Sequence, residues 1–247
     1  MDNILEVRDL KVRFPIKKGI FSRTTGYVKA VDGVSFELHR GETLGVVGES
    51  GSGKSTVARV ITGLQKPTEG SFKLNGKVAM VFQDPLGSLN PRMTVFSVLN
   101  EALVAKGAQG GRKEVSGLLD LVGIGEEALD KYPHEFSGGQ RQRICIARAI
   151  ASEPELLVCD EAVSALDLSI RAQVLDLLGD LKRKLGLSLL FITHDLGVVQ
   201  HIADRILVMN RGKIIEEGPC GQVLRAPREE YTRYLVSSVP KIGKPLT

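Results

Sequence analysis

The most constraining feature of this chain is the segment at residues 48–56, which reads GESGSGKST. Gly48, Gly53, Lys54 and Ser55 complete a Walker A pattern, in which glycines let backbone N–H groups turn inward around a phosphate. Lys54 suits the β- and γ-phosphate oxygens, and the hydroxyl of Ser55 suits a Mg²⁺ ion. The apolar run 43–47 predicts a strand before the loop, and residues 56–64 predict a helix after it. We therefore expect a nucleoside triphosphate to bind here.

A second glycine-rich segment, SGGQR at residues 137–141, opens a predicted helix farther along the chain. A helix that begins with glycines offers unhindered backbone N–H groups to an anion. One nucleotide does not need two such cradles. We therefore expect an ATPase whose site is completed by a partner, with two copies placed head to tail so that each covers the other's nucleotide.

Two acids end a predicted strand after the phosphate loop. The apolar run 156–159 leads into Asp160 and Glu161, and buried parallel strands present such residues to the ligand crevice of an α/β sheet. Asp160 suits the outer shell of Mg²⁺, and Glu161 can orient a water molecule beside the γ-phosphate. Without a phosphate loop upstream, the same pair would indicate only a solvated strand end.

Gln83 and His194 follow two other predicted strands, 78–82 and 188–193. An amide at a strand edge can contact Mg²⁺ or its water, and an imidazole can contact the γ-phosphate and respond to its loss. The structural alternatives are an ordinary loop glutamine and a histidine packed at a helix start, beside Asp195 as a capping residue.

Strand-like and helix-like segments alternate over most of the chain, which favours a parallel sheet with helices on its faces. After the first strands, apolar residues recur at helical spacing in 96–104 and 115–121. The later predicted elements are a helix at 168–185, a strand at 188–193, a helix at 195–202 and a strand at 205–209. We predict four regions: residues 1–83 and 152–222 as two parts of one core, a helical subdomain at 84–151, and a tail at 223–247.

The composition limits the classes of function. Lys and Arg number 33 against 29 Asp and Glu, without an arginine-rich tract, so nucleic-acid binding is not expected. No apolar run approaches the roughly 20 residues that cross a bilayer, and the opening MDNILEVRDL lacks the apolar stretch of a secretory signal. Cys145, Cys159 and Cys220 form no C-x-x-C pair, which favours buried thiols over a disulfide or a metal site.

The motifs occur in an order that resembles the ABC-type ATPases over essentially the whole chain. The residues that carry this resemblance are Walker A at 48–55, Gln83, SGGQR at 137–141, Asp160 and Glu161, SALD at 164–167, and His194. The SGGQ segment is specific, because Ras-like GTPases and nucleotide kinases lack it. The resemblance implies an α/β fold, a P-loop NTPase (RecA-like) core with an antiparallel β subdomain and an inserted α-helical subdomain.

A narrower resemblance is to bacterial oligopeptide, dipeptide and nickel importers, and to the second of the two ATPases that they carry. It rests on the segments LKVRFPIKKGIFSRTTGYVKAVDGVSF, VFQDPLGSLNPRMTV, YPHEFSGGQRQRI and EEYTRYLVSSVP. The chain departs from that group at Ala162, where proline is usual, and in a short linker between Gly76 and Val78. It also lacks a cysteine-rich C-terminal segment, so no iron–sulfur cluster is expected.

The resemblance implies a role for each motif, with ATP and Mg²⁺ as the ligands. The implied catalytic residues are Glu161 as general base or water-orienting carboxylate, His194, Lys54 and Gln83. Mg²⁺ would be held, directly or through water, by Ser55, Gln83 and Asp160. The implied nucleotide-binding residues are Gly48, Ser50, Gly51, Ser52, Gly53, Lys54, Ser55 and Thr56, with Ser137, Gly138, Gly139 and Gln140 acting from the partner chain, and Phe14 or Tyr27 stacking on adenine. Asp167 would lie at the dimer interface.

The resemblance also implies partners. These are two membrane-spanning permease subunits, a second ATPase subunit that is identical or different, and indirectly a substrate-binding protein, with the chain at the cytoplasmic face of the cell membrane. The expected function is to power an importer of peptides, or of nickel or related small solutes. The alternative is an ATPase-like accessory subunit of a non-transport complex, for example of the carbon–phosphorus lyase type.

Overall fold

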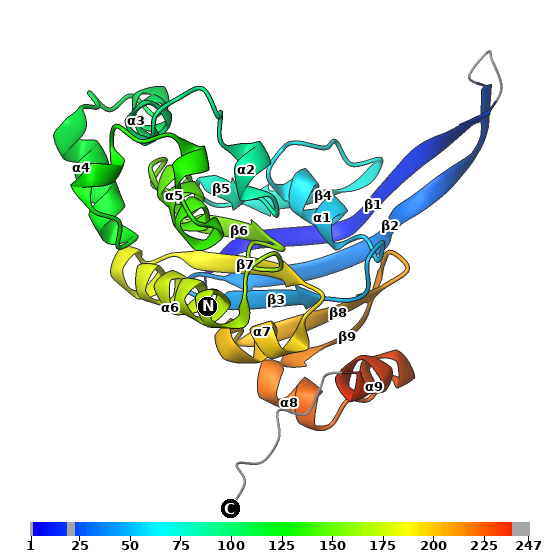
Figure 1. The fold of residues 1–247 in the computed structure, drawn as a ribbon. Coiled ribbons are helices and arrows are strands. Elements are labelled where there is room, and N and C mark those ends of the chain that lie inside the picture. Colours follow the sequence, from blue (N-terminus) through cyan, green and yellow to red (C-terminus); the bar gives the residue numbers. More distant parts are fainter. Residues whose placement is uncertain (1, 19–22, 239–247) are drawn as a thin grey trace, which may run out of the picture.

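The computed structural model of the chain describes residues 2–18 and 23–238, which form two sheets with helices packed around them (Figure 1). The larger sheet has the strand order β5–β6–β7–β3–β8–β9. Its pairings are parallel except for the one between β8 and β9. The strand bounds are β3 Thr43–Val47, β5 Val78–Val81, β6 Leu156–Asp160, β7 Ser188–Thr193, β8 Arg205–Asn210 and β9 Lys213–Pro219.

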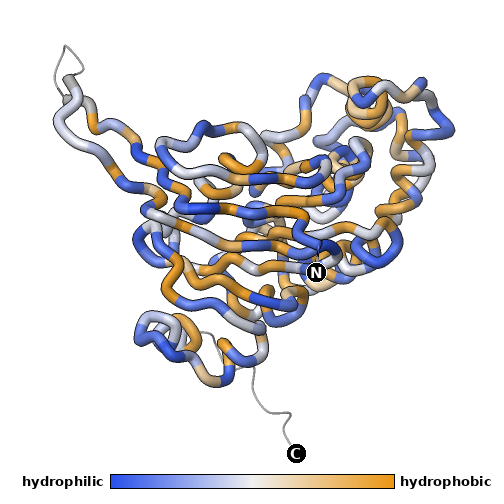
Figure 2. Tube along the Cα trace, turned by 180° about the vertical axis from the view of Figure 1, so that it is seen from behind, coloured by the Kyte–Doolittle hydropathy of each residue, from blue (hydrophilic) through white to orange (hydrophobic). Residues whose placement is uncertain are grey.

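The central strands are apolar along their whole length because both faces of this sheet are covered. Every residue of β3, β6 and β7 is buried. In β6, Leu156 and Val158 belong to one core and the alternate residues Leu157 and Cys159 belong to the other. Figure 2 shows apolar residues along the strands in the middle of the molecule, interspersed with polar ones.

The smaller sheet is antiparallel and has the order β2–β1–β4. Its strands are β1 Asn3–Lys18, β2 Arg23–His39 and β4 Glu69–Leu74. The outer half of the β1–β2 hairpin projects away from the rest of the molecule (Figure 1). Its inner half shares a core with α1 (Lys54–Ile61) and with one face of the larger sheet. This packing places the hairpin next to the element that follows the phosphate loop.

The segment between β5 and β6 is helical and forms one side of the molecule (Figure 1). Its elements are α2 Pro85–Ser88, α3 Val95–Ala105, α4 Arg112–Leu121, two 3₁₀ turns at Glu126–Ala128 and Pro133–Glu135, and α5 Gly138–Ile150. These helices share a continuous core with β6, β7 and α6 (Leu168–Leu185). Limits for a helical subdomain at 84 and 151 therefore remain a prediction.

Three helices complete the fold, namely α7 Leu196–Ile202, α8 Cys220–Arg225 and α9 Glu230–Ser237. Strand 188–193 and helix 168–185 have the bounds expected from the sequence, and Asp195 caps α7 by accepting the N–H of Gly197 at 2.9 Å. The pattern of the sequence did not predict β9, α8 or α9. Residues 239–247 of the predicted tail lie outside the described part of the chain.

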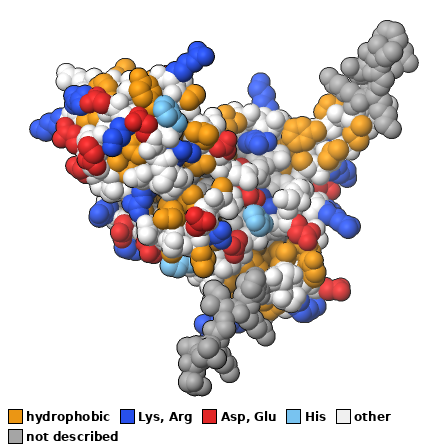
Figure 3. Space-filling view, in the orientation of Figure 1, with side chains coloured by type: hydrophobic (Ala, Val, Ile, Leu, Met, Phe, Trp, Pro, Cys, Tyr) orange, Lys and Arg blue, Asp and Glu red, His pale blue; other side chains and the backbone are white. Residues whose placement is uncertain are grey.

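The three cysteines are free and buried, which confirms the expectation of buried thiols. Burial raises the pKa of the Cys159 thiol to about 12. Among residues 2–18 and 23–238, no helix combines the length and apolarity of a membrane span. Figure 3 shows basic and acidic side chains interspersed over the visible face rather than gathered into a basic stripe.

Candidate nucleotide-binding site

The phosphate loop joins the buried end of β3 to α1, and two of its glycines are required by their surroundings. Gly48 has φ 153° and Gly53 has φ 106°, conformations that residues with a side chain rarely adopt. A Cβ at Gly48 would collide with the carbonyl oxygen of Met209, and one at Gly53 with that of Ala30. The loop can therefore close against the neighbouring strands only because these positions are glycine.

Lys54 lies beneath the loop and is only 4% exposed. Its Nζ donates to the carbonyl oxygens of Gly48 at 2.7 Å and Glu49 at 2.8 Å, and to Oγ of Ser52 at 3.3 Å. Burial lowers the pKa of Lys54, and the negative charges of Glu161 and Asp160 oppose that effect. The ammonium group is thus held at the mouth of the cradle by oxygens that phosphate oxygens can replace.

Ser55 and Asp160 converge beside the loop. The Ser55 hydroxyl donates to Oδ1 of Asp160 at 2.8 Å, and that carboxyl group is buried at the end of β6. Burial raises the pKa of Asp160, and the hydrogen bond from Ser55 partly offsets the rise. A hydroxyl and a buried carboxylate, both oxygen donors, fit a Mg²⁺ ion that keeps several of its own waters.

Glu161 occupies the centre of the polar cluster. Its Oε2 accepts Nε2 of Gln83 at 3.2 Å, and its Oε1 lies 3.3 Å from Nδ1 of His194. The Glu161 side chain is 13% exposed and that of His194 is 51% exposed. The structure therefore brings together the ends of β5, β6 and β7, as the order of the motifs predicts.

A hollow of about 320 Å³ lies over these groups. It is lined by Ala30, Ser50, Gly51, Gly53, Lys54, Ser55, Thr56, Gln83 and Glu161. A larger hollow of about 580 Å³ lies between the helical segment and the start of β6. That larger hollow has no loop of inward N–H groups, so we place the nucleotide in the smaller one.

The SGGQR segment lies apart from this hollow, since Ser137, Gly138, Gly139 and Gln140 are not among its lining residues. Ser137 caps α5: its Oγ accepts the N–H of Gln140 at 3.3 Å, and the Gln140 side chain accepts the N–H of Ser137 at 3.0 Å. A Cβ at Gly139 would collide with the side chain of Ile170. The second cradle is thus well formed but does not reach the nucleotide site of its own chain.

Phe14 and Tyr27 lie on opposite faces of the hairpin. Phe14 pairs with Val28 and Pro15 pairs with Tyr27, and successive residues of a strand point to opposite faces. Neither ring is core, since Phe14 is 39% and Tyr27 is 62% exposed. Val12, on the same face as Phe14, packs in the cluster that contains α1. Only Phe14 therefore shares a face with the element after the phosphate loop.

Two further residues contact residues of this site, although no sequence motif gave either of them a role. Arg171 of α6 donates to the carbonyl oxygen of Leu166 at 3.2 Å and pairs with Oδ2 of Asp195 at 2.6 Å. It thereby joins the SALD segment to the residue after His194. Tyr231 of α9 accepts the N–H of Glu49 with its hydroxyl oxygen at 3.0 Å.

Comparison with known proteins agrees with this geometry. Residues 31–164 match the ABC transporter family. The oligopeptide transport ATP-binding protein OppF of Lactococcus lactis is 46% identical, over 98% of this chain and 82% of that protein. OppF of Escherichia coli is 50% identical, over 96% of this chain and 78% of that protein. The dipeptide transport ATP-binding protein DppF of Haemophilus influenzae is 46% identical, over 97% of this chain and 79% of that protein.

Solved structures show the same fold. A dimeric ATP-binding cassette in a post-hydrolysis state, bound to ADP and Pi, matches with a TM-score of 0.76 and 28% identity, over 87% of this chain and 98% of that chain. An ATP-binding cassette of an ABC transporter in its ADP conformation matches with a TM-score of 0.78 and 25% identity, over 96% of this chain and 100% of that chain.

Proposed function

This chain belongs to the ABC transporter family of ATP-binding subunits, and we propose that it hydrolyses ATP to power the import of oligopeptides or dipeptides. The observation that carries ATP hydrolysis by a paired subunit is the division of the site, whereas the peptide cargo rests on the similarity to OppF and DppF. One hollow gathers the phosphate loop, Gln83 and Glu161, whereas the SGGQR cradle lies outside it. Such a site is complete only when a second ATPase subunit, identical or different, supplies its own SGGQR segment.

Substrate binding is assigned to the backbone N–H groups of residues 50–55 and to Lys54, which exchanges its carbonyl partners for phosphate oxygens. Ser55, Asp160 and Gln83 would hold Mg²⁺, which supplies positive charge to the β- and γ-phosphate oxygens. We assign adenine stacking to Phe14 rather than Tyr27, because its face of the hairpin continues onto α1.

Hydrolysis is assigned to the cluster around Glu161. A carboxylate bonded by Gln83 on one side and adjacent to His194 on the other is held in one orientation. It can accept a hydrogen bond from the attacking water and align it with the γ-phosphate, while His194 contacts the γ-phosphate. Catalysis of this kind rests on positioning and charge stabilisation, as in other phosphoryl transfers.

The hydrolysis of ATP would change how the two subunits associate. With ATP bound, each γ-phosphate takes donors from both chains, namely Lys54 and His194 of one chain and Ser137, Gly138 and Gly139 of the other. Removing that phosphate removes the bridge, so the pair separates. ATP therefore biases a two-state element. The Gln83 loop and the adjoining segment 86–94 would pass the change to two permease subunits at the cytoplasmic face of the membrane.

The test of the cargo is uptake in the native host. Deleting the encoding gene, in a strain without other peptide importers, should abolish uptake of labelled di- or tripeptides and spare uptake of the free amino acids. The wild-type chain should restore uptake and Lys54→Ala should not. Loss of nickel uptake alone would replace the peptide assignment, and loss of growth on phosphonate alone would support the non-transport alternative.

A further inference from the structure

The last helix of the described residues, α9, packs near the phosphate loop. Tyr231, Leu235 and Val236 of α9 lie against a small core made by Val47, Leu196, Val199, Ile206, Val208, Cys220 and Val223. Val47 is the last residue of β3 before the phosphate loop, and Leu196 begins the helix that follows His194. The helix α9 thus packs against a core that includes residues of both elements that deliver phosphate-binding groups. Figure 1 shows α9 beyond β8 and β9, on the opposite side of the molecule from the helical segment.

One peptide group of the phosphate loop is held at both ends. In the peptide between Gly48 and Glu49, the N–H of Glu49 donates a hydrogen bond to the Tyr231 hydroxyl oxygen at 3.0 Å. The carbonyl oxygen of Gly48 accepts a hydrogen bond from Nζ of Lys54 at 2.7 Å. A hydrogen bond donated by the N–H polarises the peptide and makes its carbonyl a better acceptor. Tyr231 therefore fixes the plane of the peptide on which Lys54 rests before the nucleotide arrives.

A buried carboxylate holds the start of α9 in turn. Glu216 of β9 accepts the N–H of Arg228 at 2.9 Å and that of Glu229 at 3.1 Å, the residues that lead into the helix. The bond to Glu229, the N-cap residue of α9, satisfies an N–H group that the start of a helix would otherwise leave free. A continuous set of contacts therefore runs from Glu216, through the start of α9 and Tyr231, to the Gly48–Glu49 peptide.

We propose that Tyr231 is a positioning residue for the phosphate loop, through which the C-terminal helix sets the affinity of the site for nucleotide. A loop that is ordered before binding loses less conformational entropy when the phosphates arrive. Because the contact is made to the loop and not to the γ-phosphate, Tyr231 strengthens the binding of ATP and ADP equally. It leaves the hydrolytic step to the cluster around Glu161.

The test is nucleotide binding by the purified chain carrying Tyr231→Phe, which removes only the hydroxyl. We expect the Kd values of ATP and ADP to rise together by about three- to tenfold, the range of one lost hydrogen bond. Turnover at saturating ATP, measured with the complex purified from the native host, should change less than about twofold. Glu216→Gln should raise both Kd values in the same direction. The double variant should fall short of the product of the two effects, because both act through one helix.

Tyr132→Phe is the matched control, since it removes the same hydroxyl at an exposed position of the helical segment, which does not line the nucleotide hollow. It should leave both Kd values unchanged. Thermal unfolding of every variant separates positioning from loss of fold. Unchanged Kd values for Tyr231→Phe would overturn the proposal, whether or not the melting temperature fell. So would weaker binding of ATP with unchanged binding of ADP. These readouts need no transport, so they stand apart from the assignment of cargo.

Discussion

At the scale of single residues, the site depends on backbone conformations that cost free energy. Glu161 has φ 51°, a left-handed conformation that costs a residue with a side chain about 1–2 kcal/mol. Its N–H donates to the carbonyl oxygen of Ile192 at 2.9 Å, and Ser164 bonds its carbonyl oxygen. These bonds hold the turn that directs the carboxylate toward Gln83 and His194.

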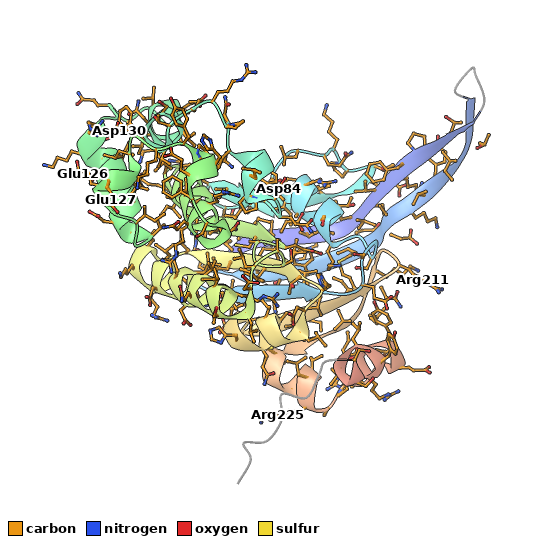
Figure 4. All side chains as sticks on the ribbon, in the orientation of Figure 1. Asp84, Glu126, Glu127, Asp130, Arg211 and Arg225 are labelled. Atoms are coloured by element: carbon orange, nitrogen blue, oxygen red, sulfur yellow. The ribbon has the colours of Figure 1, made fainter. Side chains whose placement is uncertain are left out.

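Glu161→Gln keeps the shape of this side chain and removes its charge and basicity. We expect ATP binding to the isolated chain to persist and turnover to fall by at least about 100-fold, the range attributed to a positioned proton acceptor. The measurements are nucleotide titration and phosphate release. Glu127→Gln, at an exposed position labelled at the edge of the helical segment in Figure 4, is the control and should retain full turnover. Rapid hydrolysis by Glu161→Gln would contradict the assignment.

Two glycines of the phosphate loop allow the free-energy cost of backbone strain to be separated from that of a steric clash. Both Gly51 and Gly53 have positive φ, but a Cβ at Gly51 meets nothing within 4 Å, whereas one at Gly53 meets the backbone of Ala30. We expect Gly51→Ala to lower the free energy of unfolding by about 1 kcal/mol, from backbone strain alone. Gly53→Ala should cost clearly more, about 3 kcal/mol, and abolish ATP binding. Chemical denaturation measures both, and equal losses would show that the contact with Ala30 does not matter.

At the scale of elements, the sequence predicts the strands and helices that have a clear apolar pattern and the polar residues that directly follow them. Strand β7 has the predicted bounds because its buried run is continuous, and helix α6 has them because its buried apolar residues recur at helical spacing. Strand β9 was missed because KIIEEGP mixes polar and apolar residues at an antiparallel edge. The polar ends of β5, β6 and β7 were found because each directly follows an apolar run. Tyr231 was not, since its contact with Glu49 joins residues 182 positions apart, and neither the phosphate loop nor the segment EEYTRYLVSSVP indicates that the two residues meet.

Arg171 connects two elements that carry different parts of the site. Its guanidinium holds the SALD segment through Leu166 and the His194 loop through Asp195. We expect Arg171→Ala to lower turnover about tenfold with ATP affinity unchanged within about twofold, because the bond network and not the phosphate loop is lost. Arg171→Lys should restore little of the lost turnover, since an ammonium group cannot reproduce the planar fork of a guanidinium. Arg183→Ala, at an exposed position on the same helix, is the control. A proportional loss of ATP affinity in Arg171→Ala would refute the connection.

The attachment of α9 should respond to pH. Burial would raise the pKa of Glu216, but the N–H groups of Arg228 and Glu229 favour its carboxylate, so the pKa lies below its usual 4.5. A pKa lowered by folding stabilises the chain above about 4.5, and this stabilisation disappears as the pH falls through the lower, folded value. Wild type should therefore exceed Glu216→Gln in free energy of unfolding at pH 7, and the difference should shrink near pH 4. Glu101→Gln, at an exposed position of α3, should show no such narrowing.

At the scale of the whole molecule, the chain carries two anion cradles at separate places. Each is well formed, but the hollow over the phosphate loop is open and has no residue of the SGGQR segment in its lining. The γ-phosphate would therefore lie exposed in a single chain. In the function proposed above, this chain is half of a pair in which ATP supplies the contact between the subunits and hydrolysis removes it.

Ser137→Arg tests this arrangement, because a bulky cation at the start of α5 blocks the cradle without touching the phosphate loop of the same chain. ATP binding by the isolated variant should match wild type within about twofold. Turnover by the complex purified from the native host should fall at least tenfold, since the partner's γ-phosphate loses its donors, a loss of about 1.4 kcal/mol or more in the barrier. Ser71→Arg, the same substitution on an exposed position of β4, controls for added charge. If the Ser137→Arg complex turned over normally, each chain would have to complete its own site. If the isolated variant failed to bind ATP, the two cradles would not be separate.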